Sequence, residues 1–131
     1  MTTKEGLVCP LVPLHPLPRI TIDLPGCGGV IRAEVTDFEV EEVPAYEPCG
    51  EGEHLYIWLE KRDLSGGLLR RLLARALDIP DREIGMAGLK DRRAVTRQWV
   101  SIPARYEAAL EHFDDDRVVL LDRRRHGNKL R

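Results

Sequence analysis

The segment from His54 to Leu77 limits the fold of this chain more than any other part of the sequence. From His54 to Lys61, leucine or isoleucine occupies every second position, and this alternation predicts a β-strand. Ser65 can then cap a helix, because leucines recur at helical spacing from Leu68 to Leu77, with arginines on the opposite side. A strand that leads directly into an amphipathic helix favours a domain in which sheet and helix share a core.

Shorter segments on both sides of this unit predict the rest of the sheet and a second helix. Apolar or β-branched runs bounded by glycine, proline or acidic residues are typical of short strands. Together the segments favour an α+β fold, with a mixed or antiparallel sheet and flanking helices. The Pro- and Gly-rich segment 1–29 is expected to be an extended arm, and 30–131 the folded domain. The predicted strands are Val30–Val35, Phe38–Val43, Ile84–Ala87, Gln98–Ile102 and Val118–Leu121, and the predicted helix is Tyr106–Phe113.

Composition excludes several classes of protein. With 43% hydrophobic and 32% charged residues, the chain of 131 residues is typical of a soluble globular protein, and it has no apolar run of membrane-spanning length. The segment 1–18 has neither a basic start nor an apolar block, so we expect a cytoplasmic protein without a secretory signal. Cys9, Cys27 and Cys49 form no Cys-x-x-Cys pair and share no ligand spacing with the histidines. We therefore expect neither a metal site nor a disulfide framework.

Charge is unevenly distributed along the chain, although the net charge is only −2. The stretch Glu34–Glu60 contains acidic residues but no lysine or arginine, whereas segments 90–105 and 117–131 are strongly basic. A chain of this kind can present a basic face to nucleic-acid phosphates. The same arginines could instead be solvated and paired with the acidic half of the chain. Charge alone therefore leaves nucleic-acid binding open.

Asp91 is the candidate catalytic residue that the sequence itself suggests. It follows the short predicted strand Ile84–Ala87 and lies between Lys90 and Arg92, and nearby positive charge favours an ionised carboxylate. Gly88 lets backbone or ligand approach closely. An ionised oxygen at the end of a strand is a plausible nucleophile, and the basic neighbours could hold phosphates. The simpler interpretation is that Asp91 is a salt-bridged turn residue.

The segment Ala87–Trp99, with the sequence AGLKDRRAVTRQW, closely resembles the signature motif of the pseudouridine synthase D (TruD) family, whose members modify a uridine in tRNA. Three other segments resemble family motifs in the same order, so the resemblance covers about residues 30–131. Four ordered motifs are far more specific than one. The three further segments are Asp37–Glu42, Gly50–Arg62 and His126–Arg131.

This resemblance implies a pseudouridine-synthase-like catalytic domain that isomerises uridine 13 in the D-arm of tRNA, without a metal or cofactor. By its place in the motif, Asp91 matches the essential aspartate, which promotes cleavage between uracil N1 and the ribose. Phe38 matches the aromatic residue expected to stack on the extruded base. Arg32 and Lys90 are implied to assist substrate binding, and Trp99 to pack. The candidate contacts to the tRNA backbone are Arg92, Arg93 and Arg97.

The resemblance also implies that the chain is an incomplete enzyme. The family's next motif, Gly-Asn-x-Phe, is expected shortly after Arg131, so we expect unpaired strand edges and negligible activity from this piece alone. Two other interpretations stay open: a non-catalytic RNA-binding module, and a structural domain in which Asp91 pairs with Arg92 or Lys90. A glycosidase-like pair of Asp91 with Glu39, Glu41 or Glu42 is disfavoured. Glu39 and Glu41 alternate on one face of the predicted strand Phe38–Val43 and are expected to face solvent, and the sequence gives no argument that places a second acid beside Asp91.

Overall fold

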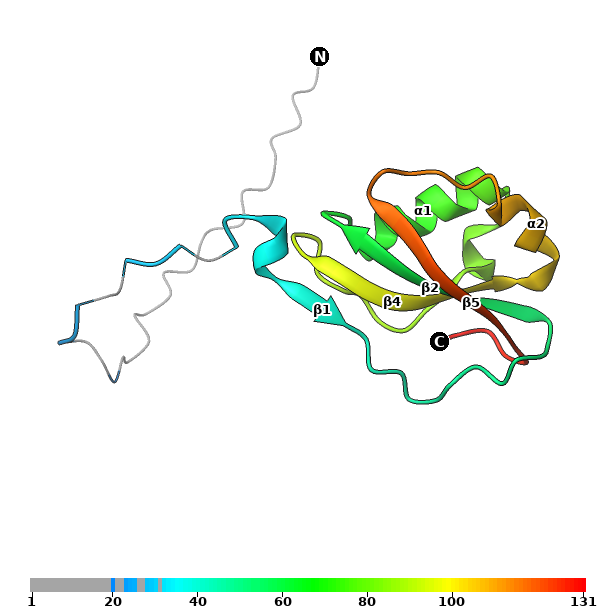
Figure 1. The fold of residues 1–131 in the computed structure, drawn as a ribbon, viewed down its shortest axis with the longest axis horizontal. Helices are drawn as coiled ribbons and strands as arrows, with labels where there is room; N and C mark the ends of the chain where they lie inside the picture. The colour runs from blue at the N-terminus through cyan, green and yellow to red at the C-terminus, as the bar shows by residue number, and fades with distance from the viewer. Residues whose placement is uncertain (1–19, 21–22, 26–27, 31) are drawn as a thin grey trace, which may run out of the picture.

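The computed structural model describes residues 20, 23–25, 28–30 and 32–131 (Figure 1). Five strands form one mixed sheet, in the order β1-β4-β2-β5, and β3 pairs with β4 beside β1. The strands are β1 (Glu39–Glu41), β2 (His54–Arg62), β3 (Gly85–Met86), β4 (Val95–Pro103) and β5 (Val118–His126), and the helices are α1 (Gly66–Leu77) and α2 (Glu107–Leu110). Three single turns of 3-10 helix lie at Val35–Asp37, Asp81–Glu83 and Ala104–Tyr106.

The pairing of the strands determines which loops meet at each end of the sheet. β2 runs antiparallel to both β4 and β5. It pairs with β4 along its whole length and with β5 along nearly all of it. β1 pairs parallel with the start of β4, in the register Glu39 opposite Val95. Because β1 and β4 are parallel, the residues that precede each strand lie at the same end of the sheet. This end therefore brings the chain before Glu39 next to the loop that leads into Val95.

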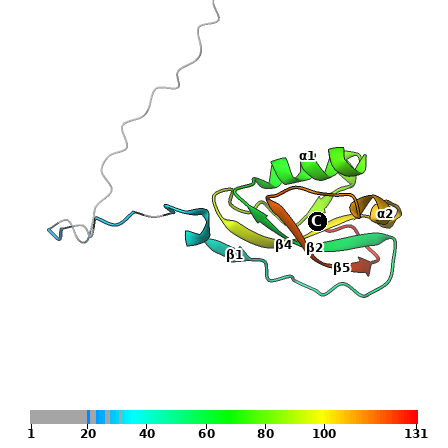
Figure 2. The same ribbon diagram turned by 45° about the horizontal axis from the view of Figure 1, so that its top comes forward.

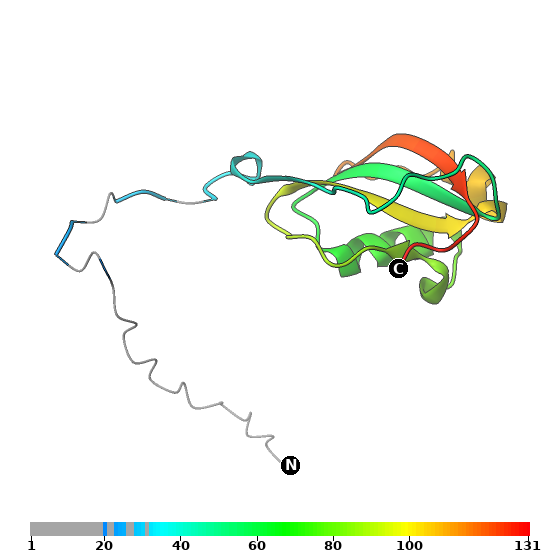
Figure 3. The ribbon, with the colours of Figure 1, turned by 90° about the horizontal axis from the view of Figure 1, so that it is seen from below.

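Both helices pack on one face of the sheet, and the long connection from β1 to β2 passes along the other side (Figures 2 and 3). Ser65 caps α1 by accepting a hydrogen bond from the amide of Leu68 at 3.3 Å, and Asp78 ends the helix in the left-handed conformation. The apolar stripe of α1 and the alternating residues of β2 form the main core, which stabilises the fold by removing apolar area from water. This core contains Leu55, Ile57 and Leu59 of β2, Val100 and Ile102 of β4, and Leu69, Leu73 and Leu77 of α1.

A smaller apolar cluster lies on the opposite face of the sheet. Tyr56 and Trp99 are buried there together with Leu130, and Trp58 packs against them. The segment that follows β5 crosses this region, and its Leu130 amide donates a hydrogen bond of 2.9 Å to Ser101 Oγ. The residues after β5 are thus part of the fold, because they bury an apolar side chain and satisfy a buried amide.

The structure confirms the α+β class and the mixed sheet with flanking helices, and it corrects several element boundaries. The predicted strand Val30–Val35 is wrong: residues 32–34 form a bend and the 3-10 turn follows. Asp37 there accepts a hydrogen bond from the Glu34 amide at 2.9 Å, and such a local bond competes with strand pairing. β1 and α2 are shorter than predicted, whereas β4 begins earlier and β5 continues through three arginines. Most of the predicted arm 1–29 lies outside the described residues.

Candidate active site

The predicted site residues Phe38 and Asp91 come together at one end of the sheet. Phe38 directly precedes β1, and its carbonyl oxygen accepts a hydrogen bond of 3.0 Å from the Val95 amide at the start of β4. Asp91 lies in the loop that leads into the same strand. The parallel pairing of β1 with β4 is thus what places an aromatic residue and a carboxylate near each other, although 53 positions separate them (91 − 38).

Arg32 joins these two side chains. Its guanidinium carbon lies 4.3 Å from the centre of the Phe38 ring, within the range of a cation–π contact. The guanidinium Nη1 lies 3.7 Å from Asp91 Oδ1. The Asp91 side chain is 51% exposed, so its carboxylate is open to solvent on the side away from this ion pair. Arg32 itself has a left-handed backbone (φ 55°), which is uncommon for a residue other than glycine.

The basic residues next to Asp91 in the sequence are directed elsewhere. Lys90 donates a hydrogen bond of 2.8 Å to the Ala87 carbonyl and pairs with Glu42 at 3.4 Å. Burial raises the pKa of Glu42, and Lys90 opposes that shift. Sequence adjacency therefore does not make Lys90 a partner of the Asp91 carboxylate. Within the part of the chain that the structure describes, the ion-pair partner of that carboxylate is Arg32.

Two arginines, Arg92 and Arg93, directly follow Asp91 in the sequence. Both are exposed, and both line a hollow at the surface. Arg92 pairs with Asp63 at 3.6 Å, and Arg93 donates a hydrogen bond of 2.8 Å to the Ala33 carbonyl. Together with Glu34 and Val35, these residues line a hollow of about 510 Å³. Its two arginines could contact phosphate only after they give up these weak surface contacts.

Arg97, the third predicted backbone contact, lies within a cluster of carboxylates. Its guanidinium is 2.9 Å from Glu60 and also pairs with Glu39 and Glu41, which are both exposed as expected from the sequence. Burial would raise the pKa of Glu60, but hydrogen bonds from Arg62 and Arg97 outweigh it and lower that pKa. The positive charge of Arg97 is therefore largely neutralised within the protein.

Most of the basic segment 117–131 is paired in the same way. Arg117 contacts Asp115, and Arg124 contacts Asp122 and Glu47. Arg125 and Arg123 reach from β5 to acids at α2, so the basic run is a set of structural ion pairs rather than a free cationic face.

Lys61 is a residue at this end of the sheet that the sequence analysis did not single out. Its side chain is fully buried, and Nζ donates a hydrogen bond of 2.8 Å to the main-chain oxygen of Asp91. A signal for it existed, because Lys61 continues the buried alternation of Leu55, Ile57 and Leu59 with a charged residue. A cation on the apolar face of a strand requires a specific partner.

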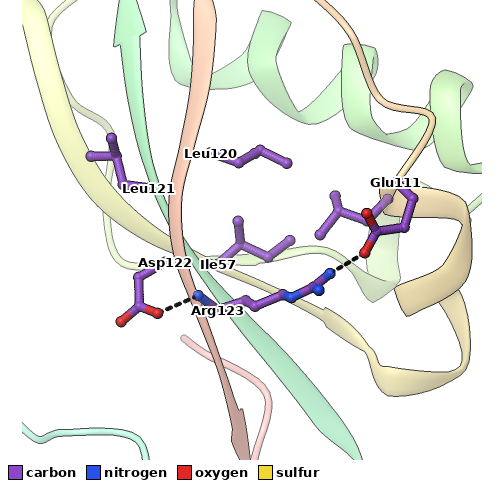
Figure 4. Close-up of a pocket in the computed structure, with 7 residues that line it drawn as sticks. Ile57, Glu111, Leu120, Leu121, Asp122 and Arg123 are labelled. Carbon is purple, nitrogen blue, oxygen red and sulfur yellow. Dashed lines mark hydrogen bonds and ion pairs between the residues drawn. The ribbon is translucent and has the colours of Figure 1, made fainter.

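A separate pocket lies between β5 and α2 (Figure 4). Ile57, Leu110 and Leu120 are among the residues that line it, and Arg123, which also lines it, pairs with Glu111. None of the predicted site residues lines this pocket. Within the described residues, no group of three or more histidine, cysteine, aspartate or glutamate side chains is arranged to hold a metal ion. No helix of the described chain is both long and apolar enough to cross a membrane.

Comparison with known proteins shows which family the chain resembles. The sequence profile of tRNA pseudouridine synthase D (TruD) matches residues 18–131, which is most of the chain. The chain belongs to the TruD family. A tRNA pseudouridine synthase D of Thermus thermophilus is 53% identical over 117 residues, which make up 87% of this chain and 32% of that protein. The protein of the same description from an Anaeromyxobacter species is 47% identical over 114 residues, covering 87% of this chain and 33% of the relative.

A solved structure shares the fold of this TruD chain. The crystal structure described as a putative tRNA pseudouridine synthase D of Methanosarcina mazei superposes with a TM-score of 0.69 at 35% identity. The match covers 82% of this chain and 25% of that one. The chain thus spans 32% of the length of the Thermus thermophilus relative and 25% of the length of the Methanosarcina mazei protein in the crystal structure. The resemblance expected from the four motifs is confirmed.

Proposed function

We propose that this chain forms the Asp91-bearing part of a tRNA pseudouridine synthase that converts a uridine in the D-arm of tRNA to pseudouridine. The observation that best supports the proposal is the position of the Arg32 guanidinium, over the Phe38 ring and beside the Asp91 carboxylate. An acid, a cation and an aromatic ring thereby meet at an exposed edge of the sheet. Family membership supports the same reaction for the complete enzyme. In that enzyme we propose residues 30–131 as the N-terminal portion of the catalytic domain.

The reaction requires the target nucleotide to leave its stack, because the bond that breaks is inaccessible inside a helix. Phe38 offers a ring on which the extruded uracil can stack, which offsets part of the cost of unstacking. Uridine and pseudouridine have the same atoms: the N1–C1′ bond is replaced by a C5–C1′ bond, and a proton passes from C5 to N1. The protein therefore needs to supply a base or nucleophile and a pocket, and it needs neither a metal nor a redox cofactor.

Asp91 can begin this isomerisation in two ways. Its carboxylate can attack C1′, so that uracil departs with the electron pair of the N1–C1′ bond and an ester links Asp91 to the ribose. Alternatively the carboxylate removes the C2′ proton, and uracil departs as a C1′–C2′ double bond forms. In both routes the freed base turns and rejoins through C5. Both require an ionised, accessible carboxylate, and a side chain that is 51% exposed meets the second requirement.

The tRNA contacts are proposed from charge and exposure. Arg92 and Arg93 border the hollow beside the Asp91 loop, where a phosphate could replace the Asp63 and Ala33 contacts. Lys90 and Arg32 are proposed to help hold the substrate near the carboxylate. Arg97 is retained as a weaker candidate, since three carboxylates already surround it. An enzyme that acts on tRNA is expected in the cytoplasm.

The test is the Asp91→Asn substitution in an enzyme that joins residues 1–131 to the remaining two thirds of the Thermus thermophilus relative. We expect pseudouridine formation to be lost, with tRNA affinity and unfolding temperature unchanged, because the Arg32–Asp91 pair is largely exposed and stabilises little. Asp81→Asn is the matched control: it alters another exposed ion pair, with Arg70, that involves none of the proposed site residues, and it should leave activity intact.

Other outcomes of this experiment would reject the proposal. If the unsubstituted enzyme bound tRNA but formed no pseudouridine, the chain would be an RNA-binding module. If Asp91→Asn lowered stability while tRNA bound to neither protein, Asp91 would be a structural turn residue.

A further inference from the structure

Lys61 is the one lysine buried completely within the described part of the chain. It lies near the end of β2, opposite Thr96 of β4 on one side and Val118 of β5 on the other. Its side chain continues the row of Leu55, Ile57 and Leu59 on the helix-covered face. An apolar residue would fill this position at lower cost, since a buried ammonium loses its hydration.

The hydrogen bond that Lys61 makes gives this buried amine a role. Lys61 Nζ donates a hydrogen bond of 2.8 Å to the main-chain oxygen of Asp91. Asp91 is 30 residues further along the chain, in the loop between β3 and β4. Burial lowers the pKa of Lys61, the Asp91 carboxylate opposes this shift, and Lys90 adds to it. The Asp91 carboxylate thus favours the charged form of the Lys61 amine, and the amine also donates a hydrogen bond to the Asp91 backbone.

The other contacts of this loop are made by the neighbours of Asp91, or by its exposed side chain, which pairs with Arg32. Lys90 bonds to the Ala87 carbonyl and pairs with Glu42 at 3.4 Å, and Arg93 bonds to Ala33 at the surface. Gly88 takes a left-handed conformation (φ 69°) and Leu89 is 78% exposed, so the part of the loop next to Asp91 is mostly exposed, whereas Ala94 at its end is buried. The bond from Lys61 connects the catalytic position directly to the rigid centre of the sheet.

We propose that Lys61 is a positioning residue, which holds the main chain of Asp91 from inside the core and thereby keeps its carboxylate beside Arg32 and Phe38. The catalytic meaning of this position rests on the proposed function, whereas the attachment of the loop does not. The role is indirect, because Nζ binds a backbone oxygen and does not face the substrate. A displacement of about 1 Å at a catalytic group can reduce a rate by on the order of 10²-fold.

The test substitutes methionine for Lys61, which keeps an unbranched side chain of similar length and removes the donor. Leu59→Met is the matched control, at the preceding buried position on the same face of the same strand. In the 131-residue chain, backbone order parameters of residues 88–93 are measured by NMR. We expect them to fall below about 0.6 in Lys61→Met and to stay near about 0.85 in the parent and in Leu59→Met.

The second readout separates positioning from packing. In the joined enzyme described above, Lys61→Met should lower kcat by about 10- to 100-fold and change KM for tRNA by less than about twofold. Leu59→Met should leave both constants nearly unchanged. A substitution that only disturbed packing would change unfolding temperature and leave kcat near that of the parent.

Two results would be decisive. Unchanged order parameters and unchanged kcat in Lys61→Met would overturn the inference. If Lys61→Met loosened the loop but the unsubstituted joined enzyme formed no pseudouridine, the attachment of the loop by Lys61 would stand and the proposed function would be rejected. Should Lys61→Met fail to fold, Lys61→Gln gives the same decision, because its amide is one bond too short to reach Asp91 and leaves a polar group in place.

Discussion

Replacing Gly85 with alanine should destabilise this protein through the segment that follows β5. A Cβ at Gly85 would lie 2.3 Å from both the Leu130 carbonyl oxygen and Ser101 Oγ. Real Cβ contacts are not this short, and one of the two atoms belongs to the backbone, which cannot rotate away. The substitution therefore pushes the segment around Leu130 off the sheet.

The cost follows from what this displacement breaks. The bond from the Leu130 amide to Ser101 Oγ contributes about 0.5–1.5 kcal/mol. Leu130 is 8% exposed, and returning its side chain to water costs about 1.5–3 kcal/mol. The expected loss in the free energy of unfolding is therefore about 2–4.5 kcal/mol. Such a loss is a large fraction of the stability of one domain.

Urea unfolding followed by circular dichroism measures this loss. For a slope near about 2 kcal/mol per molar urea, the midpoint should fall by roughly 1–2 M. Gly67→Ala is the control with the opposite sign: its Cβ would meet nothing within 4 Å, at the start of α1, where alanine is the better helix former. A Gly85→Ala midpoint equal to or above that of the parent would show that the close approach at Leu130 does not hold this segment.

Two further predictions concern charge. Because arginine contacts lower the pKa of Glu60, its ionised form stabilises the folded chain above the unfolded pKa, near about 4.3, and this contribution is lost as pH falls through the folded pKa. The Glu60→Gln variant should thus have a lower free energy of unfolding than the parent at pH 7, and this difference should disappear toward about pH 3. Unfolding measured across this pH range would contradict the prediction if the difference stayed constant. Arg92→Ala and Arg93→Ala in the joined enzyme should each reduce the slope of log affinity for tRNA against log salt by about 0.7–0.9, while Arg97→Ala, whose cation is already neutralised, should change that slope less. Salt titrations of tRNA binding give these slopes directly, and three equal slopes would mean that Arg97 contacts the phosphate backbone after all.

The strand and helix between His54 and Leu77 could be predicted because their patterns are local. Alternation along β2 and the helical spacing of leucines after Ser65 record which side of each element meets the core. The prediction of a strand at Val30–Val35 was wrong. Its β-branched residues are typical of strands, but this segment pairs with no strand among the described residues. The hydrogen bond from the Glu34 amide to Asp37 stabilises a local turn there instead. The second half of β5 was missed because its arginines are paired with acids that come from distant segments.

Sequence alone determined the family and the central strand–helix unit, and it singled out Asp91 as the candidate catalytic residue, since each is written in residues that are neighbours along the chain. Tertiary structure decided which groups face that carboxylate. Lys90 and Arg92, its neighbours in sequence, turn to Glu42 and Asp63, whereas Arg32 and Lys61 reach Asp91 from far along the chain. The reason is that partners of a side chain are set by strand pairing and register, here the parallel β1–β4 and antiparallel β2–β4 pairs, which no local pattern encodes.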